Sequence, residues 1–447
     1  MPLIRLESSE TSVPPALAAS LESARDTFVD ADAVDFDVEA NLCPRLPADL
    51  PFFALPEQQL LAYEKHRETS ELGHIFRIAN GLHDHIDAVV MTGAGGGFLG
   101  ARAIAAACCD PYHNETTRAA RGSKPRIYFA GDELDNDQLQ SLIGRLSAGG
   151  YGDGAAEGTW AIIAADAAGH SDSPRYVRDH LIELLRTSTP SIAPELRARL
   201  VTAIGPSSNP SSGPIAQHLA SLGFDQSLRV PAAVANRNSV FTPMGLLSSA
   251  FLGLDCIQLL VGAAAINENF RKEPFDQNLV LRFVAANRAA AKGDDRPAGC
   301  KRFFAWWARS LDGFQDWIRC LHPDHWPLDV ATESGRSVLT AQLESECLRR
   351  DSLVCNHIEV AAIRTDPLPV TPGQALRRGD DSESVRQLQQ HSAARVDQQL
   401  SAFGIRQNRI TLPVIDTHSL GQWMQLMMLS ASIESVMEAN PSSHGTK

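Results

Sequence analysis

A glycine-rich turn between a predicted strand and a predicted helix is the part of the sequence best suited to hold an anion. Residues 88–92 read A-V-V-M-T, an apolar run typical of a buried strand, and the glycine-rich stretch 93–100 follows before a helical segment. Such a unit offers free backbone N–H groups and a helix amino end to a negative charge. Gly95, Gly97 and Gly100 also satisfy the G-x-G-x-x-G spacing of dinucleotide-binding proteins.

Two alternatives stay open for this turn. A dinucleotide site also needs an acidic residue at the end of the second strand, about 20 residues further on. Here the second predicted strand ends at Asp132, which is too late for a compact β-α-β unit. The other alternative is a tight turn between strand and helix that binds no ligand. The turn taken alone does not decide between these uses.

Other reactive side chains do not form a metal site or a hydrolase triad. His322, Asp324 and His325 lie too close together, and Pro323 interrupts them, so they cannot form a helical pair of metal ligands. No G-x-S-x-G turn, which would present a nucleophilic serine, occurs in the chain. We therefore predict that the protein binds no metal.

The elements that must position these groups alternate between strand and helix. Further strand-like apolar runs occur at 126–131 and 160–165, each followed by a helical segment, and the pattern resumes at 301–307 and 357–362. This alternation predicts an α/β fold with mostly parallel sheets that are covered by helices on both faces.

The chain is long enough for more than one domain. At about 100–200 residues per domain, 447 residues accommodate two or three domains. We predict an N-terminal arm at residues 1–50, a first domain at 51–245, and a second domain with a C-terminal helix at 246–447.

Charge and composition exclude several classes of partner. The 40 Lys and Arg residues against 53 Asp and Glu give a formal net charge of −13, which argues against binding to nucleic acid or to an anionic membrane surface. The longest apolar tract, 245–266, is interrupted by Asp255 and Gln258, so we expect buried helices there rather than a membrane span. The eight cysteines form no C-x-x-C pair, and we interpret them as reduced, mostly buried thiols of a cytoplasmic protein.

Three stretches of the sequence resemble the glucose-6-phosphate isomerases, whose chains carry two sugar-isomerase (SIS) domains. Residues 93–102, G-A-G-G-G-F-L-G-A-R, are similar to the family pattern G-I-G-G-S-x-x-G-A-R. Residues 230–247, V-P-A-A-V-A-N-R-N-S-V-F-T-P-M-G-L-L, are similar to V-P-x-x-V-G-G-R-F-S-V-x-T-P-V-G-L-L. Residues 412–422 and 438–441 resemble the closing helix and the I-N-P that follows it. The chain is identified as a divergent member of this family.

The resemblance implies two SIS-type domains, each a mostly parallel sheet flanked by helices. It implies a homodimer whose site lies where domains and subunits meet, and a sugar phosphate as the ligand. The reaction would be the aldose–ketose isomerisation of glucose 6-phosphate and fructose 6-phosphate through an enediolate, a step of glycolysis and gluconeogenesis. No metal or organic cofactor takes part in it.

Two of the matching motifs carry site residues. Arg237 matches the family arginine that would stabilise the enediolate. Gly95, Gly96 and Gly97 match the substrate-binding glycines, although Gly97 stands where the family has a serine. Next to the arginine, Ala235-Asn236 replaces a Gly-Gly pair.

Other catalytic positions differ from the family pattern. The phosphate loop S-K-S-G-x-T is reduced to Gly169 and Ser171, and Asp166 introduces a negative charge that opposes phosphate binding. The base is either Asp324, counted from a preceding tryptophan, or Glu333, in a shortened copy of the family's A-E-S-x-G-K motif.

The family's catalytic histidine has no counterpart at its usual place. His418 occurs in a similar phrase, D-T-H-S-L-G-Q, but by its order in the chain it belongs to the final helix, so it is a candidate both for catalysis and for a structural role. These departures keep two further interpretations open. One is a catalytically degenerate SIS protein that binds a ligand or a partner, and the other is an isomerase that prefers a less anionic sugar.

Overall fold

The computed structural model describes residues 2–9, 13–33, 42–148, 159–165, 172–189, 192–206, 213–288, 301–321, 328–329, 353–370 and 384–439. The chain divides into two compact units. The first unit comprises residues 32–261, and the second comprises residues 1–31 together with 262–447. Within the described residues, each unit contains one five-stranded sheet.

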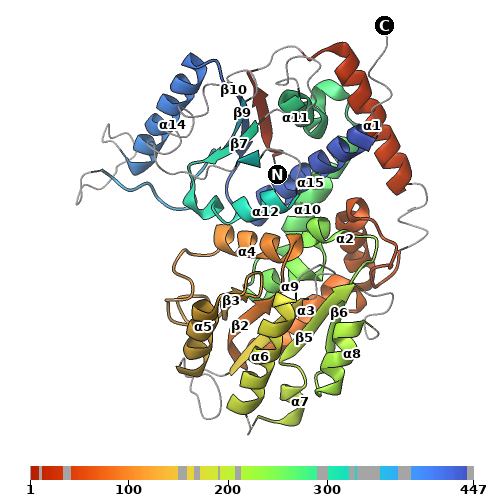
Figure 1. The fold of residues 1–447 in the computed structure, drawn as a ribbon, viewed down its shortest axis with the longest axis vertical. Coiled ribbons are helices and arrows are strands. Elements are labelled where there is room, and N and C mark those ends of the chain that lie inside the picture. Colours follow the sequence, from red (N-terminus) through yellow and green to blue (C-terminus); the bar gives the residue numbers. More distant parts are fainter. Residues whose placement is uncertain are drawn as a thin grey trace. The chain divides into compact units, whose positions relative to one another are not determined.

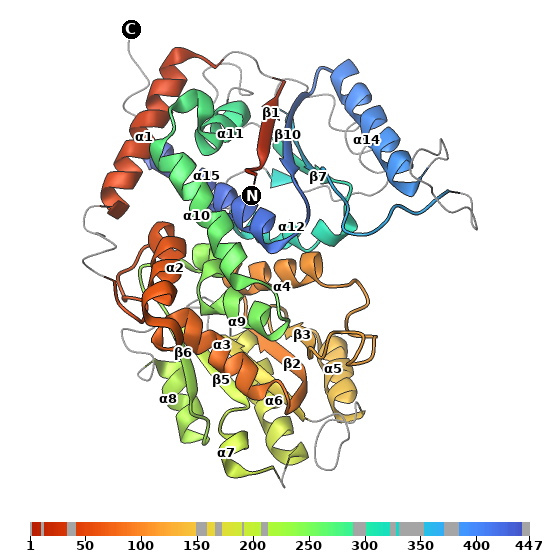
Figure 2. The same cartoon turned by 180° about the vertical axis from the view of Figure 1, so that it is seen from behind.

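The sheet of the first unit is parallel throughout, with the strand order β3-β2-β4-β5-β6. Its strands are β2 (Ile86–Thr92), β3 (Arg126–Ala130), β4 (Thr159–Ala165), β5 (Val201–Pro206) and β6 (Gln226–Val230). Its helices are η1 (Phe52–Ala54), α2 (Leu55–His66), η2 (Arg67–Thr69), α3 (Glu71–Leu82), α4 (Gly96–Cys108), α5 (Asn136–Ala148), α6 (Ser173–Ser188), α7 (Pro194–Arg197), α8 (Pro214–Ser221), η3 (Asn236–Phe241) and α9 (Pro243–Phe251). Helices α6 and α8 pack on one face of the sheet, and α3 and α9 cover the other (Figures 1 and 2).

The central strands of this sheet explain where a ligand would bind. All seven residues of β2 and all seven of β4 are buried, as expected for strands covered on both faces. From β2 the chain runs to β3 on one side and then to β4 on the other, so the direction of the connections reverses between β2 and β4. In open α/β sheets, ligands bind outside the carboxyl ends of the strands at such a reversal.

The second unit has the strand order β1-β10-β9-β7-β8. Its strands are β1 (Arg5–Ser8), β7 (Lys301–Trp306), β8 (Leu328–Asp329), β9 (Leu353–Val360) and β10 (Arg406–Leu412). Its helices are α1 (Pro15–Ala33), α10 (Cys256–Lys272), within which the division between the units falls, η4 (Phe275–Gln277), α11 (Leu279–Arg288), η6 (Arg309–Leu311), α12 (Phe314–Leu321), α14 (Val385–Ala402) and α15 (Thr417–Ala439). Helix α14 lies on one side of the sheet, and α11 and α15 lie on the other (Figures 1 and 2).

The two sheets share the order of four strands. In each, an interior strand (β2 or β7) has the strand that follows it in the chain on one side, and the next two strands follow on the other side. The fifth position is taken by β6 in the first unit, and by β1, antiparallel to β10, in the second. The connections of the second sheet therefore reverse between β7 and β9. The predicted fold class, two mostly parallel sheets flanked by helices, is confirmed.

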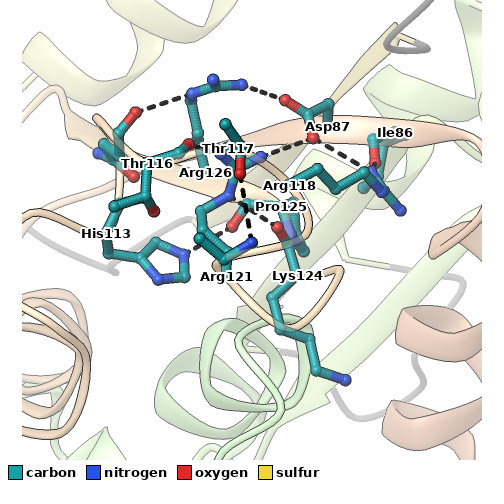
Figure 3. Close-up of polar contacts among 12 residues, drawn as sticks. Ile86, Asp87, His113, Thr116, Thr117, Arg118, Arg121, Lys124, Pro125 and Arg126 are labelled. Carbon is teal, nitrogen blue, oxygen red and sulfur yellow. Dashed lines mark hydrogen bonds and ion pairs between the residues drawn. The ribbon is translucent and has the colours of Figure 1, made fainter.

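At the amino end of β2, one buried carboxylate gathers three guanidinium groups (Figure 3). Arg121 and Arg118 lie 2.6 and 3.2 Å from Asp87 Oδ1, and Arg126 bonds to Oδ2. The other N–H groups of these arginines donate to main-chain oxygens; for example, Arg121 Nε donates to Lys124 O at 3.0 Å. Buried charges are tolerated only when they are paired and hydrogen-bonded. The cluster thus fixes the connection between α4 and β3 against the amino end of β2.

The second unit buries a neutral row of polar side chains, in addition to the Arg302–Glu434 ion pair. Ser8 Oγ donates to Asn408 Oδ1 at 2.7 Å, Asn408 Nδ2 donates to Asn356 Oδ1 at 2.9 Å, and Asn356 Nδ2 donates to Asn287 Oδ1 at 2.9 Å. Ser8, Asn408 and Asn356 occupy matching positions on β1, β10 and β9, and Asn287 comes from α11. The row therefore ties three strands and one helix together in register.

The boundaries of the two units differ from the predicted domain boundaries at residues 50 and 245. Residues 1–31, which we expected in a separate arm, contribute an edge strand to the second sheet. The physical reason is that β1 pairs with β10 along its whole length, which the local sequence does not reveal.

The structure shows where the apolar tract and the cysteines of the sequence lie. Residues 245–266 lie in α9 and α10, and no helix among the described residues is long and apolar enough to cross a membrane. Cys256 and Cys355 are buried, Cys43 is exposed, and the other cysteines in the described ranges are half-buried. Among the six cysteines that the structure describes, fewer are buried than we expected, because several lie at helix ends and in loops rather than in the cores.

Candidate active site

The glycine turn begins where the strand order of the first unit reverses. Gly93 N–H donates to Ala130 O, at the end of β3, over 3.1 Å. A Cβ atom added to Gly93 would lie 3.2 Å from Ala165 Cβ, at the end of β4. Gly95 then adopts a φ of +81°, a conformation that favours glycine, and precedes the first turn of α4. The turn is thus held between the carboxyl ends of the two strands that flank β2.

The three glycines at 95–97 abut the segment that carries Arg237. A Cβ atom added to Gly96 would lie 2.5 Å from both the Cα and the carbonyl oxygen of Arg237. Added to the first or third glycine, it would collide with the side chain of Asn236 or Ser239, respectively. No side chain fits at these positions unless η3 moves. The glycines therefore have a packing role that the sequence did not reveal, and their role in substrate binding stays a prediction.

Hydroxyl groups of the motif at 230–247 hold η3 in place. Ser239 Oγ donates to Asn236 O at 2.7 Å, and Thr242 Oγ1 donates to Ser239 O at 2.6 Å. Thr242 Oγ1 also accepts from Met244 N–H at 3.3 Å and so caps α9. The serine and threonine of the motif therefore build a rigid turn that presents Arg237.

Arg237 is available to an anion. Its side chain is half-buried and makes no hydrogen bond or ion pair with any residue in the described ranges. No side chain caps the first turn of α4, although Gly96 and Gly97 in that turn are buried. An uncapped helix amino end carries a partial positive charge and unsatisfied N–H groups. Because the backbone of Arg237 touches Gly96, both positive groups belong to the same corner of the sheet.

Asn236 is a residue of this corner that the sequence analysis did not select. It stands where the family has the second glycine of a pair, and that departure was the only signal in the sequence. Its side-chain amide packs against Gly95, and its Oδ1 atom is buried without a hydrogen-bond partner. A buried acceptor of this kind favours a hydrogen-bond donor nearby.

An ion pair lies on the β3 side of the turn. Arg102 Nη1, on α4, is 2.6 Å from Asp132 Oδ2, just after β3. Asp132 is the acidic residue that we considered for the ribose of a dinucleotide. Because Arg102 already pairs with this carboxylate, the pair disfavours the dinucleotide alternative.

Four of the predicted site residues fall outside the described residues: Gly169, Ser171, Asp324 and Glu333. Asp166, the acidic residue of the altered phosphate loop, does so as well. The assignments of the phosphate loop and of the catalytic base therefore remain predictions.

His418 belongs to the second unit, at the second position of α15, and its side chain is buried. Gln422 Oε1 accepts from the backbone N–H of Ile4 at 2.8 Å, so its Nε2 faces His418 Nδ1 at 3.0 Å. Nδ1 must then act as an acceptor, which requires the neutral ring. Burial also lowers the pKa of His418, although the nearby Asp416 opposes this shift. Gln422 fastens the N-terminal segment to α15, His418 bonds to that glutamine, and the catalytic role of His418 remains a prediction.

Comparison with known proteins shows distant relatives named glucose-6-phosphate isomerase. No protein-family model matches the chain. It is 25% identical over 247 residues to the glucose-6-phosphate isomerase of Listeria monocytogenes serotype 4b (strain F2365), covering 54% of this chain and 51% of that protein. It is 23% identical over 222 residues to the enzyme of Clostridium novyi (strain NT), covering 50% and 46%. The chain spans about half the length of the curated relatives it matches.

Solved structures extend the likeness to most of the chain. A hypothetical protein from Thermus thermophilus superposes with a TM-score of 0.71 and 19% identity, covering 97% of this chain and 94% of that one. A glucose-6-phosphate isomerase from Chlamydia trachomatis D/UW-3/Cx superposes with a TM-score of 0.60 and 12% identity, covering 93% and 81%. The resemblance seen in the motifs is confirmed: the chain is a divergent relative of the glucose-6-phosphate isomerases and shares their fold.

Proposed function

We propose that the protein is a phosphosugar isomerase that interconverts glucose 6-phosphate and fructose 6-phosphate. The observation that carries this proposal is the half-buried Arg237, which has no partner among the described residues and is held by glycines 95–97 at the reversal of the first sheet. An unpaired guanidinium beside an uncapped helix amino end suits a ligand that is both anionic and rich in oxygen. The distant isomerase relatives support the same ligand class.

In the proposed reaction, a carboxylate removes the proton from C2 of the open-chain aldose. The electron pair forms the C1–C2 double bond, and negative charge moves onto the C1 oxygen. Arg237 stabilises that oxygen in the enediolate. A proton then passes from the C2 hydroxyl to O1, and the base returns its proton to C1, which gives the ketose. We assign the base to Asp324 or Glu333.

Kinetics of arginine variants test the proposal. The full chain is assayed for conversion of fructose 6-phosphate to glucose 6-phosphate, and Arg237→Ala is compared with Arg186→Ala, which removes an arginine half exposed on α6. We expect Arg237→Ala to lower kcat/KM by about 10²–10³-fold, a typical cost of losing one group that stabilises an oxyanion. Arg186→Ala should match the wild type. Full activity of Arg237→Ala would contradict the assignment of Arg237 to the active site.

A non-catalytic ligand-binding protein is the alternative. Position 97 bears on this question, because it is a glycine and Ser239 Oγ fills the space that a family serine would need there; that hydroxyl already donates to Asn236 O. One group that could hold the sugar is therefore absent at this position. Protection from thermal unfolding by glucose 6-phosphate that is lost in Arg237→Ala, without turnover in the wild type, would support this alternative.

The base and the assembly are tested separately. Asp324→Asn and Glu333→Gln should differ, because only the true base is needed for exchange of the C2 proton with solvent, whereas both variants should bind glucose 6-phosphate. We also propose a homodimer in the cytoplasm, as the resemblance implies. Light scattering of the purified protein measures its mass directly, and a monomer at micromolar concentration would contradict the dimer.

A further inference from the structure

A pocket of about 490 Å³ lies in the second unit, between the amino half of α14 and the sheet. Trp307 and Ala308, which follow β7, line it together with Val360 and Ala361 at the end of β9. The pocket therefore lies at the carboxyl ends of β7 and β9, where the connections of the second sheet reverse. Its volume is within the range of about 300–1,000 Å³ that is typical of ligand sites.

The sequence of α14 explains why the pocket is open. In the carboxyl half of this helix, Val396 and Leu400 pack into the core of the unit. The positions on the same face one and two turns earlier are Ala393 and Gln389, both of which line the pocket. No large apolar side chain of α14 fills this space, so the helix packs closely on the sheet only at its carboxyl half.

The charged walls of the pocket are already paired, with an excess of carboxylate. Arg409 Nε lies 2.6 Å from Glu359 Oε1, Arg409 Nη2 pairs with Asp397, and Arg409 Nη1 lies 3.7 Å from Glu7 Oε2. Three carboxylates thus share this one guanidinium.

The second guanidinium of the pocket is also occupied. Arg386 Nη1 donates to Gln389 Oε1 at 2.9 Å, and Nη2 donates to Val360 O. Neither arginine of the pocket is free to receive an anion in the way that Arg237 is. The walls therefore carry three carboxylates against two guanidinium groups.

We propose that this pocket binds a small polyol that carries a protonated amine, an amino sugar without phosphate. The ammonium group would meet the surplus carboxylate of Glu7 and Glu359. Its hydroxyl groups would bond to the amide of Gln390, while its C–H face would lie against Trp307. A phosphate would face like charge here, so the pocket selects against sugar phosphates.

Calorimetric titration of the full chain tests this site with three probes of similar size: glucosamine, glucose and glucose 6-phosphate. Below about pH 7 the amine of glucosamine is protonated. We expect glucosamine to bind about tenfold more tightly than glucose, because only the amine uses the carboxylate surplus. Ala393→Leu fills the pocket without removing a charge, and it should weaken glucosamine binding at least about tenfold. Gln398→Leu, on the exposed side of the same helix, should leave binding unchanged.

Three results would overturn the proposal: no binding of glucosamine to the wild type, equal binding to Ala393→Leu, or tighter binding of glucose 6-phosphate at a site that Ala393→Leu blocks. Arg237→Ala separates this pocket from the proposed active site. Glucosamine binding that Arg237→Ala abolishes and Ala393→Leu preserves would place the ligand in the first unit instead. Glu359→Gln provides a second readout, because it should reduce the preference for glucosamine over glucose while binding of glucose persists.

Discussion

Four strands of each sheet follow the same order, yet a different polar cluster fixes the strands of each sheet. The first unit buries an ionic cluster, in which Asp87 receives three arginines. The second buries a neutral row of one serine and three asparagines across β1, β10, β9 and α11. Strand order follows from the handedness and length of the connections. The order of the strands therefore does not determine which polar residues are buried. These residues depend on which loop or strand has to be fixed in each unit.

The carboxyl ends of the two sheets differ in the sign of the charge that they carry. At the reversal of the first sheet, Arg237 is unpaired among the described residues and a helix amino end is uncapped. At the reversal of the second sheet, three carboxylates surround two occupied guanidinium groups. The carboxyl end of the first sheet thus carries unpaired positive groups, and that of the second carries a surplus of carboxylate.

Asp87→Ala is the substitution expected to have the largest effect on stability. It would leave Arg121, whose side chain is fully buried, and two neighbouring arginines without their carboxylate. Breaking a buried ionic network costs about 3–5 kcal/mol, and urea unfolding of the first unit measures this loss. Asp84→Ala, at a side chain that is 92% exposed, is the matched control and should change stability by less than about 0.5 kcal/mol. Equal stability of the two variants would mean that the arginines do not depend on Asp87.

Asn356→Leu should have the next largest effect, in the second unit. The leucine would leave Asn408 Nδ2 and Asn287 Oδ1 buried and unpaired. Each buried unsatisfied group costs roughly 1–3 kcal/mol, so we expect a loss of about 2–4 kcal/mol. Because the row is neutral, this loss should not change with salt. Urea unfolding at low and high salt makes the comparison, and a strong salt dependence in Asn356→Leu would contradict it.

Gly96→Ala tests the close approach of α4 and η3. The added methyl group would meet the backbone of Arg237, which must shift, and overpacking of this kind costs about 1–3 kcal/mol. We also expect weaker binding of glucose 6-phosphate, since Arg237 moves with η3. Gly144→Ala is the control on helix α5, because nothing lies within 4 Å of the added atom. That variant should gain up to about 1 kcal/mol of stability, and a loss there would contradict the open space around Gly144.

Acidification should have the smallest effect, through His74 on α3. Burial, followed by the charges of Arg45 and Arg77, lowers the pKa of His74 from 6.5 to about 4. Between pH 6.5 and pH 4, His74 is therefore protonated in the unfolded chain but not in the folded chain. Stability falls as the pH drops from 6.5 toward 4. We expect a contribution of about 1 kcal/mol between pH 7 and pH 5, reduced by the partial exposure of the ring.

His74→Gln should remove this share of the acid sensitivity. His180→Gln, at an exposed ring on α6, should not. Thermal unfolding of both variants at the two pH values provides the measurement. An unchanged pH dependence in His74→Gln would assign the sensitivity to other groups.

The sequence predicted the parts of the fold whose signal is local. The apolar runs of β2, β4 and β9 were visible because these strands are buried. Strand β10, R-Q-N-R-I-T-L, was missed because its polar residues are satisfied by distant partners, and Asn408 bonds to Asn356, 52 residues away. No local pattern contains such a pairing.

The same distinction applies to the candidate site. Arg237 was found because the motif around it is long and unusual. The contact of Gly96 with Arg237 was not found, because it depends on how η3 packs against α4, and these elements lie more than a hundred residues apart in the chain. For the same reason, the polar pocket beneath α14 had no signature in the sequence.

The pairing of β1 with β10 has a consequence for how the chain is made. Ser8 cannot form its hydrogen bond until Asn408, 400 residues later in the chain, has been synthesised. At about 5–20 residues per second, the ribosome needs roughly 20–80 s to reach it. The first unit is continuous, from 32 to 261, so it can fold during this interval, whereas the second remains incomplete. Strand β1 is thus placed long after it is synthesised, and the nascent chain must keep it from pairing elsewhere until β10 has emerged.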